Sequence, residues 1–129
     1  MTTVALFSMG DRGFIANASY DGKVLHAHAS GSVERPGAHE ELARFLDRVL
    51  READLLKPRE VAIDVRDLEF VDTTGVRKLT LWVGGLRDRP TPMPFGLRFV
   101  TSAKVNWQRR SLEVLRVLAV GTLTIETTA

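Results

Sequence analysis

The sequence contains no cysteine, no long apolar run and almost no net charge. Without cysteine, disulfide frameworks, thiolate metal sites and cysteine nucleophiles are excluded. No apolar stretch approaches the ~20 residues that a membrane-spanning helix requires. The first ten residues carry no basic leader, and the apolar stretch from Val4 to Phe7 is too short for the core of a secretory signal. We therefore expect a cytoplasmic protein that has no membrane segment.

Length and composition are typical of one globular domain. The chain has 129 residues, of which 44% are hydrophobic and 26% are charged. This is enough apolar material to bury one core. We expect a single domain over residues 1–129, with its central part spanning about residues 13–127.

The net charge of +2 is unevenly distributed. Residues 33–72 hold seven Lys or Arg against eleven Asp or Glu, whereas residues 73–118 hold nine against two. The basic residues of the second segment are Arg77, Lys78, Arg87, Arg89, Arg98, Lys104, Arg109, Arg110 and Arg116. This asymmetry is typical either of an anionic partner or of two solvated faces that differ in charge. No helix-turn-helix or stacked-aromatic pattern accompanies it, so we expect no nucleic-acid partner.

Residues 60–86 are the most informative stretch, because the hydrophobic period changes within it. Val61, Ile63 and Val65 alternate with other residues, and β-branched residues at period two predict a strand. Apolar residues then recur at three- and four-residue steps, at Val76, Leu79, Val83 and Leu86. This second spacing places them on one face of a helix.

Between the two patterns lie four short residues, Asp72-Thr73-Thr74-Gly75. Asp or Thr at this position accepts hydrogen bonds from the unpaired N–H groups of the first helical turn. Both threonine hydroxyls are expected near the positive end of the helix macrodipole. From the residues alone, the segment is either a helix cap and nothing more, or a polar corner that another protein contacts.

The remaining elements follow from similar patterns. Asp21-Gly22 between two apolar-containing runs predicts a hairpin within residues 14–33. Helices are predicted over residues 38–55 and 106–118, strands over residues 97–101 and 123–126, and a proline-rich loop over residues 87–94. Lys57-Pro58 ends the first helix. Strands joined through helices favour parallel neighbours. The predicted fold is therefore α/β, a mixed sheet with an N-terminal hairpin and about three covering helices.

The strand, polar corner and helix together resemble the signature of the STAS domain, the fold of bacterial anti-sigma-factor antagonists. The matching residues are Ile63-Asp64, the apolar link Leu68-Glu69-Phe70-Val71, then Asp72-Thr73-Thr74-Gly75 and the helix from Val76. The resemblance extends more loosely from about Gly13 to Thr127, and its architecture agrees with the predicted element order. The Trp107-Gln108 pair at the entry to the last helix resembles a less-studied branch of small STAS-like regulators.

The resemblance implies a non-enzymatic signalling regulator of bacterial transcription that works by partner switching. It implies an ATP-binding anti-sigma or serine-threonine kinase partner, a phosphatase, and no cofactor. By position in the motif, the phosphoacceptor is Thr74, with Thr73 as the alternative. The implied partner-binding surface comprises Asp72, Thr73, Thr74, Gly75, Arg77, Lys78 and Trp82. Self-association is left open, and so is the choice between packing and interface roles for Trp82 and Trp107.

Other chemistries find less support in the residues. The alternative function is a small-ligand or anion-binding module that uses the basic C-terminal half. His26, His28 and His39 have no acidic or cysteine partner at a recognisable spacing, so we expect unrelated histidines and no metal site. The chain contains neither a phosphate-binding loop nor a nucleophile elbow, since Ala29-Ser30-Gly31-Ser32 lacks the required frame. We therefore expect no catalytic residues.

Overall fold

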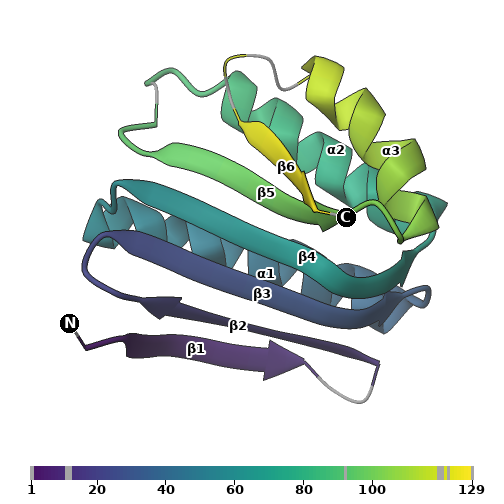
Figure 1. Cartoon of the computed structure of the whole chain (residues 1–129), viewed down its shortest axis with the longest axis horizontal. Helices are drawn as coiled ribbons and strands as arrows, with labels where there is room; N and C mark the ends of the chain where they lie inside the picture. The colour runs from purple at the N-terminus through teal and green to yellow at the C-terminus, as the bar shows by residue number, and fades with distance from the viewer. Residues whose placement is uncertain (1, 11–12, 92, 119–120, 122, 129) are drawn as a thin grey trace.

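The computed structural model describes residues 2–10, 13–91, 93–118, 121 and 123–128. Within these residues the chain forms one six-stranded sheet and three helices (Figure 1). The strands are β1 (Val4–Gly10), β2 (Phe14–Tyr20), β3 (Val24–Val33), β4 (Glu60–Val71), β5 (Gly96–Ser102) and β6 (Thr124–Thr128). The helices are α1 (Pro36–Leu56), α2 (Thr73–Arg87) and α3 (Asn106–Leu118). The predicted α/β class and mixed sheet are confirmed.

The strands lie in the sheet in the same order as in the sequence. β1, β2 and β3 pair antiparallel, whereas β3, β4, β5 and β6 pair parallel. Each parallel pair is joined through one helix, and such crossovers share one hand. Because the strands advance in one direction across the sheet, all three helices lie on the same face (Figure 1). None of the described helices covers the opposite face of the sheet.

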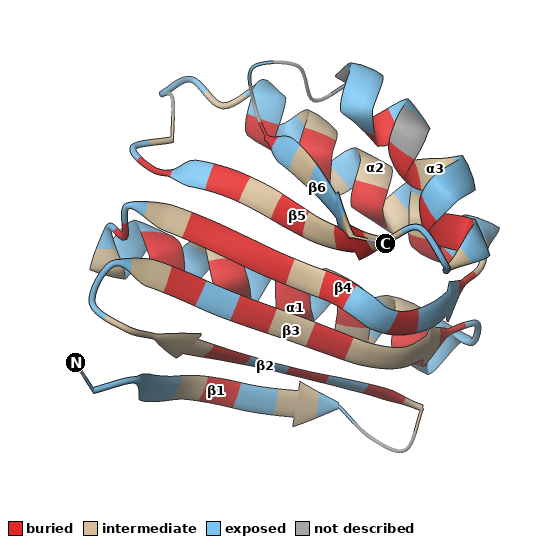
Figure 2. Ribbon diagram, viewed as in Figure 1, coloured by how far each residue is buried: buried red, intermediate tan, exposed pale blue. Residues whose placement is uncertain are grey.

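The hydrophobic core lies between the sheet and the helices (Figure 2). Val61, Ile63 and Val65 of β4 are buried, whereas Asp64 is only partly buried and Arg66 is exposed. On α1 the buried residues are Ala38, Leu42, Phe45, Leu46, Val49 and Ala53. This is the face that the helical spacing predicts.

The predicted hairpin is confirmed and has a clear local cause. The Asp21 carboxylate accepts hydrogen bonds from the backbone N–H groups of Lys23, at 2.9 Å, and Val24, at 2.7 Å. Gly22 adopts a φ of +95°, which glycine tolerates without strain. The turn therefore sets the antiparallel register of β2 and β3, in which Tyr20 faces Leu25.

Strand β1 was not predicted from the sequence. It pairs with β2, and Phe7 packs edge-to-face on Phe45 of α1 with ring centroids 6.3 Å apart. The register shifts between Ala5 and Phe7, so the strand lacks the regular alternation that reveals a strand in a sequence. The sheet is thus one strand larger than expected and begins before residue 13.

The C-terminal elements differ from the predictions only at their ends. The last strand spans Thr124–Thr128 rather than residues 123–126. Helix α3 has the predicted bounds and buries Leu112 and Leu115, whereas the side chain of Leu118 lies outside the described part. None of the described helices combines the length and apolar character needed to cross a lipid bilayer.

Candidate functional site

The corner between β4 and α2 has the structure that its sequence predicts. Asp72 is the N-cap of α2, and its Oδ1 accepts a hydrogen bond from the backbone N–H of Gly75 at 2.9 Å. The backbone N–H of Asp72 donates to the carbonyl of Val33 at 2.9 Å, which ties the corner to the end of β3. A carboxylate at this position satisfies the helix N-terminus and favours its dipole.

Gly75 lies where no larger residue fits without a shift of its neighbours. A Cβ atom on Gly75 would be 2.5 Å from Cγ1 of Val71 and 3.0 Å from Cγ1 of Val33. Real Cβ atoms do not approach carbon atoms so closely. The glycine therefore allows the first turn of α2 to pack directly on the ends of β3 and β4.

His39 of α1 is the residue at this corner that sequence reasoning missed. Its Nε2 lies 2.8 Å from Oδ1 of Asp72 and 2.9 Å from Oδ2. The side chains of His39 and Asp72 are 13% and 29% exposed. Burial works to raise the pKa of Asp72, but the N–H of Gly75 and the His39 ring outweigh it and hold that pKa below its usual value. No local pattern signals the pair, because it joins separate elements.

The two threonines of the corner are exposed. Thr73 and Thr74 are the first two residues of α2, directly after the cap. Neither hydroxyl has a hydrogen-bond partner within the described part of the chain. The carboxylate of Asp72, in contrast, is engaged by His39 and Gly75. The corner thus presents two accessible hydroxyls beside a carboxylate that is held in place.

The rest of the predicted surface does not lie in one place. Arg77 is exposed and Lys78 is half-buried, one turn along α2 from the threonines. Trp82 lies eight residues beyond Thr74, which is about 12 Å along the helix axis. Its ring packs edge-to-face on Phe99, with centroids 6.3 Å apart. The structure therefore places Trp82 between α2 and the sheet, away from the threonines.

A groove of about 840 Å³ lies beside the corner. Among the residues that line it are Phe70, Thr73, Val76, Lys104, Val105 and Arg110. They come from the end of β4, the start of α2 and the start of α3 with the loop before it. We call this the α2–α3 groove. Thr73 lines it, whereas Thr74 does not.

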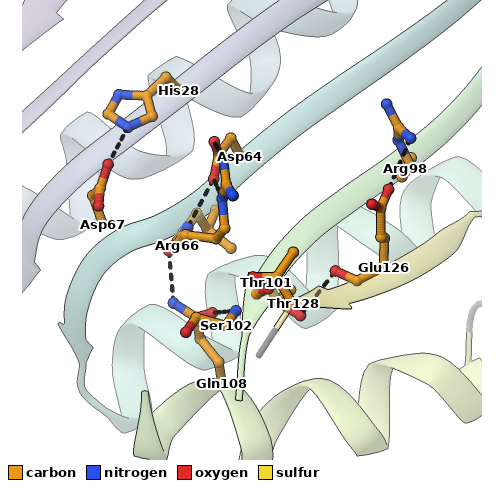
Figure 3. Close-up of polar contacts among 11 residues, drawn as sticks. His28, Asp64, Arg66, Asp67, Arg98, Thr101, Ser102, Gln108, Glu126 and Thr128 are labelled. Atoms are coloured by element: carbon orange, nitrogen blue, oxygen red, sulfur yellow. Dashed lines mark hydrogen bonds and ion pairs between the residues drawn. The ribbon is translucent and has the colours of Figure 1, made fainter. Parts of the chain in front are cut away.

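Two buried residues hold the start of α3 against the sheet. Trp107 donates from Nε1 to the carbonyl of Leu68 at 2.6 Å. Gln108 donates from Nε2 to the carbonyl of Val65 at 2.6 Å and accepts from the N–H of Ser102 at 2.8 Å (Figure 3). Trp107 is thus a packing residue, and the pair fixes one wall of the α2–α3 groove.

The three histidines do not converge on a common site. His26 lies 3.1 Å from Asp21, and His28 lies 2.7 Å from Asp67 on the uncovered face of the sheet (Figure 3). His39 contacts the different carboxylate of Asp72. Among the described residues, no group of three or more His, Cys, Asp or Glu side chains is arranged to hold a metal ion.

Much of the basic C-terminal half is neutralised locally. Arg98 lies 2.9 Å from Glu60 and 2.8 Å from Glu126, and Figure 3 shows the second contact. Arg89 lies 3.4 Å from Asp54 on α1. The nine basic residues therefore do not form one continuous anion site, although Lys104 and Arg110 share the α2–α3 groove.

No protein-family model matches the chain, and no curated protein sequence matches it. The chain is similar to the crystal structure of an anti-sigma factor antagonist from Mycobacterium paratuberculosis. The two share 15% sequence identity with a TM-score of 0.49, over 98% of this chain and 87% of the other.

Proposed function

We propose that this chain is a non-enzymatic, cytoplasmic regulator of the anti-sigma-factor-antagonist type, which binds a protein partner through the β4–α2 corner. The observation that carries the proposal is the Asp72-Thr73-Thr74-Gly75 motif, with both hydroxyls exposed where a strand ends and a helix begins. The partner is an ATP-binding anti-sigma factor or serine-threonine kinase. Phosphorylation of Thr74 releases it, and a phosphatase restores binding.

The local geometry supports a switch that leaves the fold intact. A phosphoryl group on Thr74 adds about −1.5 to −2 charges at neutral pH. The N-terminus of α2 tolerates an anion, because its backbone N–H groups and dipole favour negative charge. In a close interface, however, the added charge has to be desolvated against the partner. The expected loss of affinity is on the order of a hundredfold, or about 3 kcal/mol.

Thr74 is the first candidate for modification and Thr73 is the second. The two differ in surroundings, since Thr73 lines the α2–α3 groove and Thr74 does not. A kinase can therefore bind over Thr74 without entering the α2–α3 groove. Intact-mass measurement of the protein from its own cells, followed by fragmentation of the peptide that spans Asp72, assigns the site. An unmodified peptide under every growth condition would contradict the phosphorylation step.

Binding is tested with three variants of the full chain. Thr74→Ala and Thr74→Asp are used as baits in lysate of the source cells, and a protein retained by Thr74→Ala is then purified for titration against each variant. Thr124→Asp, which places the same charge on an exposed threonine of β6, is the control. We expect Thr74→Asp to bind about a hundredfold more weakly than Thr74→Ala, and Thr124→Asp to bind like the unmodified protein. Equal affinities for the two Thr74 variants would exclude the switch.

A second candidate function is a small-ligand or anion-binding module. The observation that favours it is the presence of Lys104 and Arg110 on one groove. A ligand that binds only the folded state raises the melting temperature, and the shift grows with the ratio of the ligand concentration to its dissociation constant. Thermal unfolding with a panel of nucleotides, acyl carriers and phosphorylated metabolites separates the two functions, since the regulator is expected to show no shift with any of them.

A further inference from the structure

The α2–α3 groove has an apolar floor that is open to solvent. Phe70 is 45% exposed, although it belongs to the strand whose neighbours Leu68 and Val71 are buried. Val76 of α2 and Val105, just before α3, are only partly buried where they pack against the core. Single exposed apolar side chains are ordinary, but these three come from β4, α2 and the loop before α3, and they border one groove.

The groove also carries positive charge that the chain itself does not neutralise. Lys104 and Arg110 line it and are exposed, and neither side chain is hydrogen-bonded or ion-paired to any described residue. Helix α3 begins directly after Val105, whose side chain cannot cap it, and its first turn contains no acidic residue. The partial positive charge of this helix N-terminus therefore adds to that of the two side chains.

The acidic residues of the groove do not pair with these two cations. Asp72 is engaged by His39 and by the N–H of Gly75, and its carboxylate makes no ion pair with Lys104 or Arg110 in the described part of the chain. Glu69 is the other acid of the lining and lies on β4, and it too makes no ion pair with Lys104 or Arg110 among the described residues. Lys104 and Arg110 therefore remain available to pair with a carboxylate, and the apolar floor favours an apolar side chain.

We propose that the α2–α3 groove is a docking site for a short segment of the partner protein that presents a carboxylate beside a bulky apolar side chain. The inference rests on the proposed function, because the groove shares Thr73 with the β4–α2 corner. The apolar side chain lies on Phe70 between Val76 and Val105, and the carboxylate pairs with Lys104 and Arg110. The groove thus supplies recognition of the partner, whereas Thr74 supplies its release.

The direct test uses peptides as probes of the full chain, followed by backbone amide NMR. The acidic apolar probe is a blocked hexapeptide of alternating Glu and Leu. One control replaces Glu by Lys, and a second replaces Leu by Ser. We expect saturable shifts at the amides of Phe70, Thr73, Lys104 and Arg110 with the Glu-Leu peptide, and at least tenfold weaker binding of both controls. Equal binding of the Lys-Leu peptide, or shifts centred elsewhere, would overturn the proposal.

Charge reversal gives a sharper version of the same test. The double variant Lys104→Glu with Arg110→Glu is expected to prefer the Lys-Leu peptide at least tenfold over the Glu-Leu peptide. The matched control is Lys23→Glu with Arg59→Glu, which makes the same change in net charge at two exposed residues near the opposite end of β4. The control is expected to keep the original preference. A reversed preference in both double variants would show a net-charge effect and contradict a site at the groove.

Two further measurements exclude other occupants. Inorganic phosphate and pyrophosphate are titrated alone, and shifts equal to those of the peptide would assign the groove to small anions instead. Spectra are also recorded over a range of protein concentration, and concentration-dependent shifts at Phe70 and Lys104 would assign it to a second copy of the chain. Either result would replace the proposed peptide segment, and unchanged spectra in both support it.

The failure of this inference is distinguishable from failure of the proposed function. Once a partner is purified through Thr74→Ala, its affinity is measured for the Lys104→Glu, Arg110→Glu double variant. At least a tenfold loss is expected. Unchanged affinity together with a working Thr74 switch would reject the groove and keep the regulator. If the peptide binds at the groove but the purified partner binds Thr74→Ala and Thr74→Asp equally, the groove is kept as a docking site and the switch is rejected.

Discussion

The ring nitrogen Nε2 of His39 lies 2.8 Å from one carboxylate oxygen of Asp72 and 2.9 Å from the other. The contact joins the first turns of α1 to the cap of α2, two elements that are separated by the whole of β4. It orients the same carboxylate that accepts the N–H of Gly75. The start of α2, and with it the exposed hydroxyl of Thr74, is therefore positioned from two directions.

The Asp72 cap is expected to stabilise the fold measurably. Asp72→Ala removes the acceptor of the Gly75 N–H, and N-cap losses of this kind cost about 1–2 kcal/mol. Asp72→Asn is expected to cost less, because asparagine caps helices as well as aspartate does. Urea unfolding at pH 7 measures both changes. Equal losses for the two variants would show that the charge of Asp72, and not its cap bond, is what stabilises α2.

The coupling between His39 and Asp72 is a separate prediction. In a double-mutant cycle of His39→Ala and Asp72→Ala, we expect an interaction free energy of about 0.5–2 kcal/mol, because the partners share hydrogen bonds. The matched cycle pairs His26→Ala with Asp72→Ala, since His26 contacts Asp21 instead. That cycle should be additive within about 0.5 kcal/mol. Additivity in both cycles would mean that the contact contributes nothing to stability.

Gly75 and Gly85 should respond in opposite directions to the same substitution. Gly75→Ala places a Cβ 2.5 Å from Cγ1 of Val71, and such overpacking is expected to cost about 1–3 kcal/mol. Gly85 lies on the same helix with nothing within 4 Å of its Cβ position. Gly85→Ala is therefore expected to stabilise the protein by about 0.5–1 kcal/mol. Thermal or urea unfolding checks the signs.

A second substitution, at Val71, should relieve the clash that Gly75→Ala creates. Val71→Ala removes the Cγ1 atom that a Cβ on residue 75 would meet. In the double variant, Gly75→Ala should then cost less than it does alone, although Val71→Ala itself loses buried apolar area. An unchanged cost would show that Val33, the next nearest side chain at 3.0 Å, limits the space.

The hydrogen bonds of Trp107 and Gln108 at the start of α3 are expected to contribute measurably to the stability of the fold. Gln108→Leu leaves the buried carbonyl of Val65 and the part-buried N–H of Ser102 without this partner, and an unsatisfied buried group costs about 1–3 kcal/mol. Trp107→Phe keeps an aromatic ring but loses the bond to Leu68, so a smaller cost of about 1 kcal/mol is expected. Hydrogen exchange at the Ser102 amide provides a local measurement, and unchanged protection in Gln108→Leu would contradict this role.

The β2–β3 turn should make stability depend on pH in the acid range. The N–H groups of Val24 and Lys23 and the ring of His26 lower the pKa of Asp21 to about 2. Because the folded pKa lies below the ordinary aspartate value of 3.8, the contribution of Asp21 to stability is fully present above about pH 4 and is lost as the pH falls towards 2. Between pH 4 and pH 2, the wild type should therefore lose more stability than the Asp21→Asn variant. The free energy of unfolding is measured with urea at several pH values between 4 and 2. An equal dependence on pH in wild type and Asp21→Asn would contradict the assignment.

Sequence reasoning succeeded where the determinants are local. The change of period between Val65 and Val76 predicted β4 and α2, and the short polar residues predicted the cap at Asp72. The Asp21-Gly22 turn predicted the hairpin. Strand β1 was missed because a register shift beside Leu6 interrupts its alternation. The same limit applied to Trp82, whose placement depends on Phe99 in another element.

The sequence by itself determined the alternation of strands and helices and the exposed Thr73-Thr74 corner, because backbone conformation and capping depend on neighbouring residues. Only the tertiary structure decided that His39 holds Asp72, that Gln108 holds the start of α3 against β4, and that Phe70, Lys104 and Arg110 share one groove. These relations join residues from elements that are far apart in the chain. They arise from sheet order and helix packing, which no periodicity within a single segment encodes.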